Sequence, residues 1–333
     1  MAADRVAILG AGSVGCFIGG CWLGRGLPVR LIGRDRIGGD IARHGLTISD
    51  YSGWSEHLAD VDFGTDPAAL ADAGIIALAV KSGATADAAA QIARHGRDGA
   101  LIISFQNGIS NVDVLQRALG KRFQVVRGMV PYNVAYLGEG RFHKGVAGDL
   151  YAEDRPETRA LAERIGAGPA ALKLSQDMLG VAWGKLLVNL NNAVNALSGR
   201  TLIEQLRQHD YRRVVAASQR EGLGLLQQAG IQPANIGVNP KLLPAIIGSP
   251  DWLFNSVFLR KWKVDARARS SMADDLAAGR RTEIDFINGE LVALAERLGR
   301  DAPVNRKIVA LVRQAESGAK PWDAAALRRE VIG

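Results

Sequence analysis

One stretch of the chain places a lysine and several amides on the same face of an expected helix. In "WGKLLVNLNNAVNALSG", Lys185, Asn189 and Asn192 fall within about 60° of one another on a helix that turns about 100° per residue. Asparagine is a poor helix former, because its side chain competes for backbone hydrogen bonds, and an exposed stripe of Glu, Lys or Gln would cost the helix less. The pattern favours the wall of a pocket for an oxygen-rich substrate. A polar seam on the surface or between helices is the alternative interpretation.

A glycine-rich turn near the start of the chain has the spacing of a dinucleotide-binding loop. "GAGSVG" fits G-x-G-x-x-G, follows a short apolar strand and opens a helix, which is the context that this motif requires. Gly10 would permit the tight turn, Gly12 the approach of a pyrophosphate, and Gly15 the close packing of the helix on the strand. The phosphates would then meet the N-terminus of the helix. A glycine turn without a ligand is the alternative. The expected cofactor-binding residues of this turn are Gly10, Ala11, Gly12, Ser13, Val14 and Gly15.

The end of the second expected strand bears on the choice of cofactor. NAD enzymes usually carry an acid here that binds the ribose hydroxyls, but this strand ends in "LIGRDR". The planar guanidinium of Arg34 can pair with a 2′-phosphate, so the sequence favours NADPH. Asp35 leaves NAD open, since a shift of one residue would make it the acid, and Arg36 could simply be solvated.

Two later strands end in polar residues. "AVKS" places Lys81, and "FQNG" places Gln106 and Asn107, at the carboxyl edge of the expected sheet, where open α/β sheets bind ligands. A ligand role is the interpretation for each of these positions. Ordinary turn chemistry is the alternative, because Asn-Gly is a common turn signal.

A second helical stretch, "RSSMADDLAAGRRTEIDFINGEL", adds Ser270, Ser271 and Glu283. Glu283 would lie beside an apolar helical stripe and, if buried, would need a cationic partner, for which Lys185 is the candidate. The stripe consists of Ile284, Ile287, Leu291, Leu294 and Leu298.

The elements that position these residues indicate an α/β chain of two domains. Residues 1–175 alternate apolar strands with helices, which predicts a parallel, Rossmann-type sheet that is covered on both faces. Residues 176–333 predict an all-α domain that carries the substrate-binding and catalytic residues. The expected strands lie in "RVAIL", "PVRLIGR", "AGIIALAVKS", "ALIISFQNG" and "FQVVRGMV", and the expected helices in residues 84–95, 111–119, 181–196, 211–229 and 264–298. Residues 231–265 are rich in proline and read as a long connection or short helices.

Composition limits the classes of partner. The 333 residues carry 41 basic and 34 acidic side chains, for a net charge of +7. This balance is typical of a solvated surface or a site for anions, and no basic run interleaved with aromatics suggests nucleic acid. Cys16 and Cys21 are expected to be small core residues in a reducing compartment. We see no signal peptide and no apolar run long enough for a bilayer, so a cytoplasmic protein without a membrane or nucleic-acid partner is expected. No metal site is expected, and apolar helical faces are compatible with a homodimer.

Taken together, the motifs resemble the ketopantoate reductase family (2-dehydropantoate 2-reductase), over nearly the whole chain. They are "GAGSVG", an arginine after the second strand, "VKS", "QNG", "WGKLLVN", "SSM" and "TEIDFINGEL", in this order. The resemblance implies a Rossmann domain, a helical domain and an active site between them, in which NADPH reduces 2-dehydropantoate to (R)-pantoate for pantothenate and coenzyme A synthesis. The residue roles that it implies are proton donation by Lys185, substrate binding by Asn189 and Ser271, a functional Glu283, and cofactor-domain contacts by Lys81 and Asn107.

The chain departs from the family pattern at two positions. Ala193 stands where a second asparagine is often found, and Asn192 or Asn195 could reach the same oxygen; Ala268 replaces another asparagine. The substrate class implied is a 2-oxo acid, and these changes leave its identity open. The alternatives are a reductase for another branched 2-oxo acid or a 3-hydroxy acid dehydrogenase, which also uses a K-x-x-x-N helix, and a non-catalytic NADPH-sensing protein.

Overall fold

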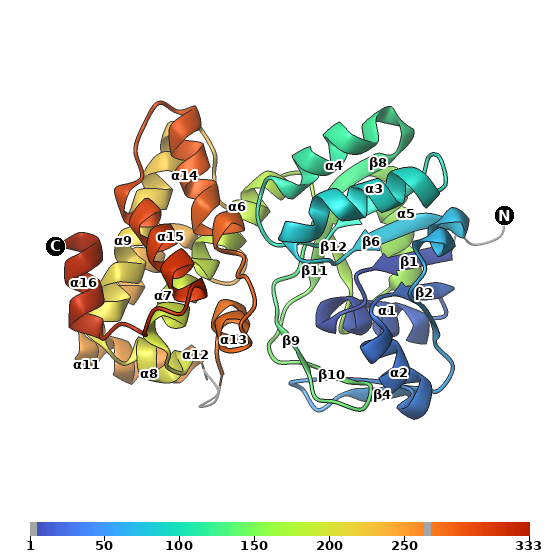
Figure 1. Ribbon diagram of the computed structural model, residues 1–333, viewed down its shortest axis with the longest axis horizontal. Coiled ribbons are helices and arrows are strands. Elements are labelled where there is room, and N and C mark those ends of the chain that lie inside the picture. Colours follow the sequence, from blue (N-terminus) through green and yellow to red (C-terminus); the bar gives the residue numbers. More distant parts are fainter. Residues whose placement is uncertain (1–4, 263–267) are drawn as a thin grey trace. The chain divides into compact units, whose positions relative to one another are not determined.

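The computed structural model describes residues 5–262 and 268–333. The chain forms two compact units, residues 1–178 and residues 179–333. The first unit is an α/β domain and the second is built from helices (Figure 1).

The centre of the first unit is an eight-stranded sheet with the order β12-β11-β8-β7-β6-β1-β2-β5. The strands from β8 to β5 are parallel, whereas β11 runs antiparallel to β8 and parallel to β12. The five strands predicted from sequence are confirmed as β1, β2, β6, β7 and β8. The strands are β1 (Arg5–Leu9), β2 (Val29–Ile32), β5 (Asp62–Gly64), β6 (Ala73–Leu78), β7 (Leu101–Ser104), β8 (Gln124–Met129), β11 (Leu150–Glu153) and β12 (Leu172–Ser175).

The register of the parallel strands aligns their carboxyl ends. Leu9 at the end of β1 pairs with Ile32 of β2 on one side and with Leu78 of β6 on the other, and Leu78 pairs with Ser104 of β7. The loops that follow these strands therefore start at one edge of the sheet. This edge carries the glycine turn, Arg34, Lys81 and Asn107.

Helices cover both faces of the sheet, because successive residues of a strand point to opposite sides. Val6 and Ile8 of β1 belong to the core beneath α1, while Ala7 and Leu9 belong to the core beneath α3 and α4. Figure 1 shows α3 and α4 together on one side and α1 on the other. The helices of this unit are α1 (Ser13–Gly24), α2 (Asp35–His44), α3 (Thr85–His95), α4 (Asn111–Leu119) and α5 (Pro156–Ile165), with short 3-10 turns η1 (Pro67–Asp72), η2 (Ser82–Ala84) and η3 (Gly120–Arg122).

A second sheet, absent from the sequence prediction, packs on the outer side of α1. Its order is β4-β3-β10-β9, and β3 pairs in parallel with β10 although the two strands are far apart in the chain. A Cβ on Gly19 would lie 2.4 Å from Leu31 of the main sheet, and one on Gly20 would lie 2.9 Å from Leu46 of the second sheet. The helix is thus sandwiched between two sheets. The strands are β3 (Leu46–Asp50), β4 (Ser55–Leu58), β9 (Val134–Tyr136) and β10 (Arg141–Lys144).

Packing on both sides explains why α1 is buried around its circumference. Cys16 and Cys21 are free thiols and both are buried in this core, as predicted. Lys144 of β10 is also buried, and its Nζ donates hydrogen bonds of 2.6 Å to the carbonyls of Gly148 and Pro169. The lysine therefore joins the second sheet to the loops beside it.

The described residues of the second unit form helices and short turns. Its helices are α6 (Met178–Asn189, which starts one residue before the unit), α7 (Asn191–Ser198), α8 (Leu202–Leu206), α9 (His209–Gln228), α10 (Leu243–Ile247), α11 (Asp251–Leu253), α12 (Leu259–Trp262), α13 (Ser271–Ala277), α14 (Asn288–Arg297), α15 (Pro303–Glu316) and α16 (Ala324–Ile332). Short 3-10 turns are η4 (Pro240–Leu242) and η6 (Ile284–Phe286), and η5 (Phe254–Phe258) is π-helical.

The predicted helix over residues 264–298 is wrong as a single helix. Residues 264–267 lie outside the described part, and the rest is divided into α13, η6 and α14. Gly279, with φ of +62°, ends the first of these helices, and Ile287 (φ −116°, ψ −87°) separates the other two. The predicted helix over 211–229 is confirmed as α9. The predicted helix over 181–196 is divided into α6 and α7 at Leu190, a turn residue whose amide still donates to the Leu186 carbonyl at 3.0 Å.

The proline-rich segment after α9 is organised around Arg212, whose side chain is completely buried. The guanidinium donates to the carbonyls of Leu206, Ile247 and Ser249 at 2.8–3.0 Å. It also pairs with Asp251 at 2.9 Å and stacks on the Phe254 ring at 4.3 Å. One cation thus fixes α10 and α11 against α9; residues 263–265 of the segment lie outside the described part.

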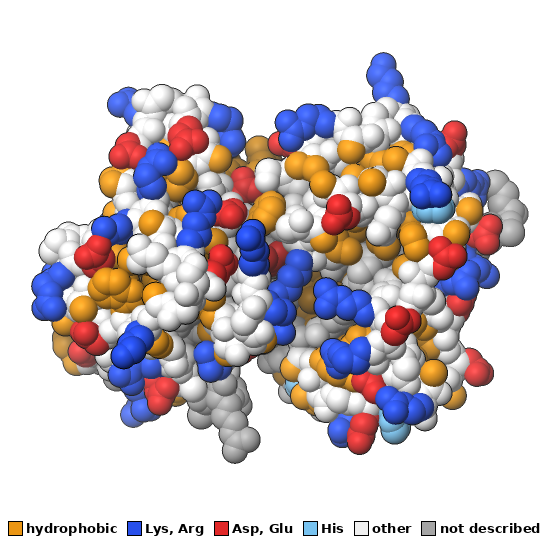
Figure 2. All heavy atoms as spheres, in the orientation of Figure 1, with side chains coloured by type: hydrophobic (Ala, Val, Ile, Leu, Met, Phe, Trp, Pro, Cys, Tyr) orange, Lys and Arg blue, Asp and Glu red, His pale blue; other side chains and the backbone are white. Residues whose placement is uncertain are grey.

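No helix in the described ranges is, on its own, long and apolar enough to span a membrane. The pair Pro240–Ile247 and Asp251–Lys261 reaches the length and composition only together, and it is bent by 113°. Basic and acidic side chains are scattered over the visible face of each unit (Figure 2).

Candidate active site

The glycine turn joins β1 to α1 at the carboxyl edge of the sheet. Gly10 has φ of +100°, and a Cβ there would lie 2.5 Å from the amide nitrogen of Val80. A Cβ on Gly15 would lie 2.4 Å from the Gly10 carbonyl oxygen. Both positions therefore require glycine for the fold itself.

Gly12 differs from these two glycines, because a Cβ there would meet nothing within 4 Å. The residue is exposed and its φ of −92° is open to any side chain. It caps the N-terminus of α1 just before Ser13 and Val14, where the first helical N–H groups lack partners within the helix. The fold itself does not require glycine at position 12. The missing side chain at this helix N-terminus leaves room for a ligand phosphate to approach the backbone closely. The residues present thus fit a dinucleotide.

The structure distinguishes the two arginines that follow β2. The Arg36 guanidinium stacks on the Tyr136 ring at 5.2 Å, and the Tyr136 hydroxyl donates a hydrogen bond to Asp40. Arg34 is exposed and precedes the first residue of α2. Its carbonyl accepts from the amides of Ile37 and Gly38, while its guanidinium forms no hydrogen bond or ion pair within the described ranges. Arg34 is thus available to a phosphate, whereas Arg36 already has a partner.

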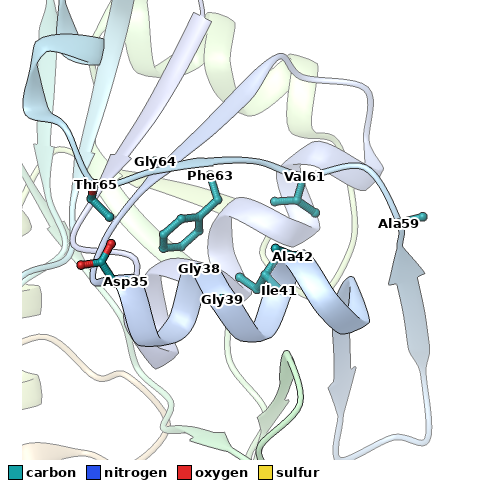
Figure 3. Close-up of a pocket in the computed structure, with 10 residues that line it drawn as sticks. All are labelled: Asp35, Gly38, Gly39, Ile41, Ala42, Ala59, Val61, Phe63, Gly64 and Thr65. Carbon is teal, nitrogen blue, oxygen red and sulfur yellow. The ribbon is translucent and has the colours of Figure 1, made fainter.

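Asp35 lines a groove of about 350 Å³ between α2 and the chain around β5 (Figure 3). Figure 3 shows Asp35 and Thr65 at one end of the groove and Phe63 pointing toward α2. Gly38 of α2 makes room for that ring, since a Cβ there would lie 2.6 Å from it. The groove starts beside the end of β2, next to the expected ribose position.

The loops after β6 and β7 place the remaining residues predicted in this unit. Lys81 lies in the loop three residues after the end of β6 and is exposed, and Asn107 is partly buried. Gln106 is buried, and its amide nitrogen donates to the Thr85 hydroxyl at 2.8 Å while its oxygen accepts from Ser104 at 3.0 Å. Of the two polar residues in "FQNG", Gln106 therefore has a structural role.

In the second unit, α6 and the start of α7 carry the lysine and the asparagines. Lys185 is partly buried, Asn189 is buried, and Asn192 lies at the start of α7 with partial exposure. Burial lowers the pKa of Lys185 from 10.5 to about 8, because desolvation disfavours the ammonium form. An amine with this pKa can donate a proton near neutral pH.

Ser270 and Asn195 hold the segment that carries Ser271. The Ser270 backbone N–H donates to the Asn195 side chain at 2.9 Å, and its hydroxyl donates to the Asn192 carbonyl at 3.1 Å. Asn195 is fully buried and also binds the Arg200 carbonyl. The hypothesis that Asn195 replaces the missing asparagine is therefore wrong, because both ends of its amide have structural partners. Ser271, the exposed first residue of α13, is held beside α7.

Ala193 and Ala268, the two departures from the family pattern, have different surroundings. Ala193 is completely buried in α7, and Ala268 is partly buried, with its carbonyl accepting from the Leu202 amide at 2.8 Å.

Glu283 lies on a turn rather than on a helix, which corrects the sequence prediction. It precedes η6 with φ of −94° and ψ of 27°, and it is partly buried. The preceding Thr282 donates from its amide and its hydroxyl to Glu316 of α15. Gly279 ends α13 before this point, and the tie to Glu316 holds the turn that follows. Both η6 and α7 pack on α15, so Glu283 and the asparagines belong to one group of helices; a pairing of Glu283 with Lys185 remains a prediction.

Comparison with known proteins identifies the family. The model described as "Ketopantoate reductase PanE/ApbA" matches residues 6–157, and that of its C-terminal part matches residues 177–316. A ketopantoate reductase structure from Ralstonia eutropha superimposes with a TM-score of 0.80 at 30% identity, covering 94% of this chain and 98% of the other. This chain belongs to the ketopantoate reductase family. It is an oxidoreductase of the 2-dehydropantoate 2-reductase type that uses a nicotinamide dinucleotide and acts on a small molecule.

Two further relatives show the range of similarity. The 2-dehydropantoate 2-reductase of Pyrococcus horikoshii is 28% identical over 327 residues, which span 94% of this chain and 98% of the relative. D-mandelate dehydrogenase, solved with NADH and anilino(oxo)acetate, has a TM-score of 0.76 at 19% identity, with 94% and 98% of the two chains covered. The second likeness shows a shared fold.

Substitution of the glycines separates binding from folding. Gly12→Ala should keep the thermal stability of the protein and weaken dinucleotide binding by about tenfold or more, since the new methyl group occupies space that a pyrophosphate needs. Gly15→Ala should lower the melting temperature, because its methyl group meets the Gly10 carbonyl. Thermal unfolding and a fluorescence titration with NADPH measure the two effects. Unchanged affinity in Gly12→Ala would remove the glycine turn from the binding site.

Proposed function

We propose that this enzyme reduces the ketone of 2-dehydropantoate to (R)-pantoate with NADPH, and that Lys185 supplies the proton. The observation that carries the proposal is a half-buried lysine on α6 with a pKa lowered to about 8, on the same helix as the buried Asn189 and close in the chain to Asn192, which lies at the start of the next helix, α7. Membership of the ketopantoate reductase family, and the printed names of relatives that span almost the whole chain, support the substrate.

Bound NADPH would supply a hydride to the ketone carbon. The residues of this chain act on the ketone oxygen, where negative charge develops as the hydride is transferred. The Lys185 ammonium stabilises this oxygen and then protonates it. Partial burial assists the step, since a desolvated ammonium gives up its proton more readily than one in water. The proton on Nζ thus ends on the product hydroxyl.

Amide and hydroxyl groups would orient the substrate without adding net charge. Asn189, Asn192 and Ser271 can hold its hydroxyl and carboxylate oxygens, and Asn107 can contact substrate or cofactor from the first unit. Hydrogen bonds from such groups fix orientation, which is what a stereospecific reduction requires. Glu283 would orient the Lys185 ammonium or bind the nicotinamide ribose.

The preference for NADPH rests on the contrast between Arg34 and Arg36. Arg34 offers a planar fork of donors beside the glycine turn, and Arg36 is already stacked on Tyr136. Lys81, at the same edge of the sheet, adds a second positive charge for the cofactor. Asp35 points to the groove side of α2 in Figure 3.

A reductase for another 2-oxo acid is the second candidate. Ala193 and Ala268 remove two amides that would otherwise bind substrate oxygens, and the fold is shared with a dehydrogenase solved with an aromatic 2-oxo acid analogue. Such an enzyme would keep the Lys185 chemistry and change only the pocket.

A substrate panel distinguishes these candidates. NADPH oxidation by purified protein is followed with 2-dehydropantoate, 2-oxoisovalerate, 2-oxopantolactone, phenylglyoxylate and no substrate. We expect 2-dehydropantoate to exceed 2-oxoisovalerate by roughly a hundredfold or more in kcat/KM, since a site built for a hydroxyl rejects an analogue without it. If phenylglyoxylate or 2-oxoisovalerate is the better substrate, the second candidate replaces the first.

Cofactor preference should depend on one arginine. Arg34→Ala should lower kcat/KM for NADPH by about 10- to 100-fold and leave NADH within about threefold, because a charge-assisted contact to the 2′-phosphate is worth about 1.5–3 kcal/mol. Arg36→Ala is the matched control and should have the smaller effect. Equal losses with both cofactors in Arg34→Ala would show that this side chain does not bind the 2′-phosphate.

The pH dependence of kcat/KM for reduction should follow the protonation state of the Lys185 amine. Reduction needs the protonated amine, so kcat/KM should be flat below the pKa of about 8 and fall about tenfold per pH unit above it, while the reverse oxidation should rise toward pH 8. Lys185→Ala should slow reduction by roughly a hundredfold or more. In Lys185→Arg the fall in kcat/KM above pH 8 should disappear, because a guanidinium stays charged. A wild-type profile that is flat to about pH 10, the range of an ordinary lysine, would contradict the role.

A further inference from the structure

Five buried polar side chains lie beneath the loops that carry Lys81 and Asn107. None of the five residues is more than 9% exposed. They come from the loop after β6, the first residue of α3, the end of β7, the loop after it and the first residue of α4. The residues are Ser82, Thr85, Ser104, Gln106 and Asn111.

Hydrogen bonds connect the five side chains into one chain. Ser104 donates to Gln106, which donates to the Thr85 hydroxyl at 2.8 Å. The Thr85 hydroxyl lies 2.8 Å from Oδ1 of Asn111 and 2.7 Å from the Ser82 carbonyl, and its single proton can serve either acceptor. Nδ2 of Asn111 then donates to the Ser82 hydroxyl at 3.2 Å and to the Asn107 carbonyl.

The network holds two loops that belong to different strands. The Ser82 hydroxyl also donates to the Asn107 carbonyl at 2.9 Å, so this carbonyl is held from both loops. Ser82 directly follows Lys81 in the chain. Thr85 and Asn111 begin α3 and α4, which pack against each other. The backbone at Lys81 and the backbone at Asn107 are therefore fixed relative to one another.

A gain in the free energy of unfolding does not by itself explain such a network. An apolar pair of the same shape can be about as stable as a buried hydrogen-bonded pair, but only matched donors and acceptors specify one arrangement. This arrangement lies at the sheet edge that carries the glycine turn.

We propose that Thr85 and Asn111 are positioning residues, which hold the loops after β6 and β7 in a fixed arrangement. This arrangement places Lys81 and Asn107 where they contact the nicotinamide end of the cofactor and the substrate. The inference rests on the proposed function for the ligands that it names. It adds that neither residue touches these ligands and that both act through the backbone at Lys81 and Asn107.

Two isosteric changes test the network. Thr85→Val removes the hydroxyl, and Asn111→Asp keeps Oδ1 but removes the Nδ2 donor. Each should lower kcat by roughly 10- to 100-fold, the cost of misplacing reacting groups by about 1 Å, and change NADPH affinity by less than about threefold because the glycine turn still holds the phosphates. Thr85→Ser restores the hydroxyl and should restore kcat. The two changes should be non-additive when combined, since they break the same chain of bonds.

A matched control separates positioning from general destabilisation. Thr158 of α5 is a completely buried threonine of the same unit, whose hydroxyl bonds the Glu153 and Arg155 carbonyls and not these loops. Thr158→Val should lower the melting temperature as Thr85→Val does and leave kcat and KM unchanged. If Thr85→Val shows the same kinetics as Thr158→Val, the residue is structural and the inference is wrong.

Hydrogen exchange on the free protein gives a readout that does not depend on the substrate. Amides of residues 79–85 and 105–111 should exchange about tenfold or more faster in Thr85→Val than in Thr158→Val at matched global stability. If the wild-type enzyme reduces none of the panel acids, the proposed function fails while this comparison still tests the locking of the loops. Unchanged exchange in both loops would overturn the inference even in an active enzyme.

Discussion

The close packing of α1 between two sheets is the constraint on which the first unit depends. Three glycines bring the helix near its neighbours, since a Cβ on Gly15, Gly19 or Gly20 would lie 2.4–2.9 Å from an atom of the turn or of a sheet. The helix starts directly at the glycine turn, so its position also determines where the turn and the first helical N–H groups lie. The register of β1, β2, β6 and β7 then brings the other cofactor-domain residues to the same edge.

Buried polar groups in this protein fall into two classes. Gln106 and Asn195 have partners at both ends of their amides and hold backbone segments in place. Asn189 shares α6 with Lys185, and substrate binding is the role proposed for it. A buried amide therefore does not identify a ligand site until its hydrogen-bond partners are known. The same reasoning applies to the lysines, because burial lowers the pKa of both Lys144 and Lys185, yet Lys144 donates to two backbone carbonyls of a structural junction.

The two units contribute different parts of the proposed chemistry. The first offers a bare glycine, a helix N-terminus and an exposed arginine, which suit the phosphates of a dinucleotide. The second offers an amine of lowered pKa and short amides, which suit a ketone with neighbouring oxygens. Ala193 and Ala268 alter only the second set, so a change of substrate at these positions would leave cofactor binding and proton donation intact.

The sequence by itself determined the elements whose pattern is local. The glycine turn, the five apolar strands and the lysine–asparagine helix follow from residue spacing within short windows, and the order of the motifs was enough to identify the family. Tertiary structure decided what depends on distant partners. The second sheet pairs β3 with β10 across roughly 90 residues, its strands are only three to five residues long, and β11 runs against the main sheet, so no short window of sequence shows them. The turn that carries Glu283 is held by the bond from Thr282 to Glu316, and Arg36 was distinguished from Arg34 by the ring of Tyr136. In each case the deciding interaction joins residues far apart in the chain, and local periodicity carries no information about such partners.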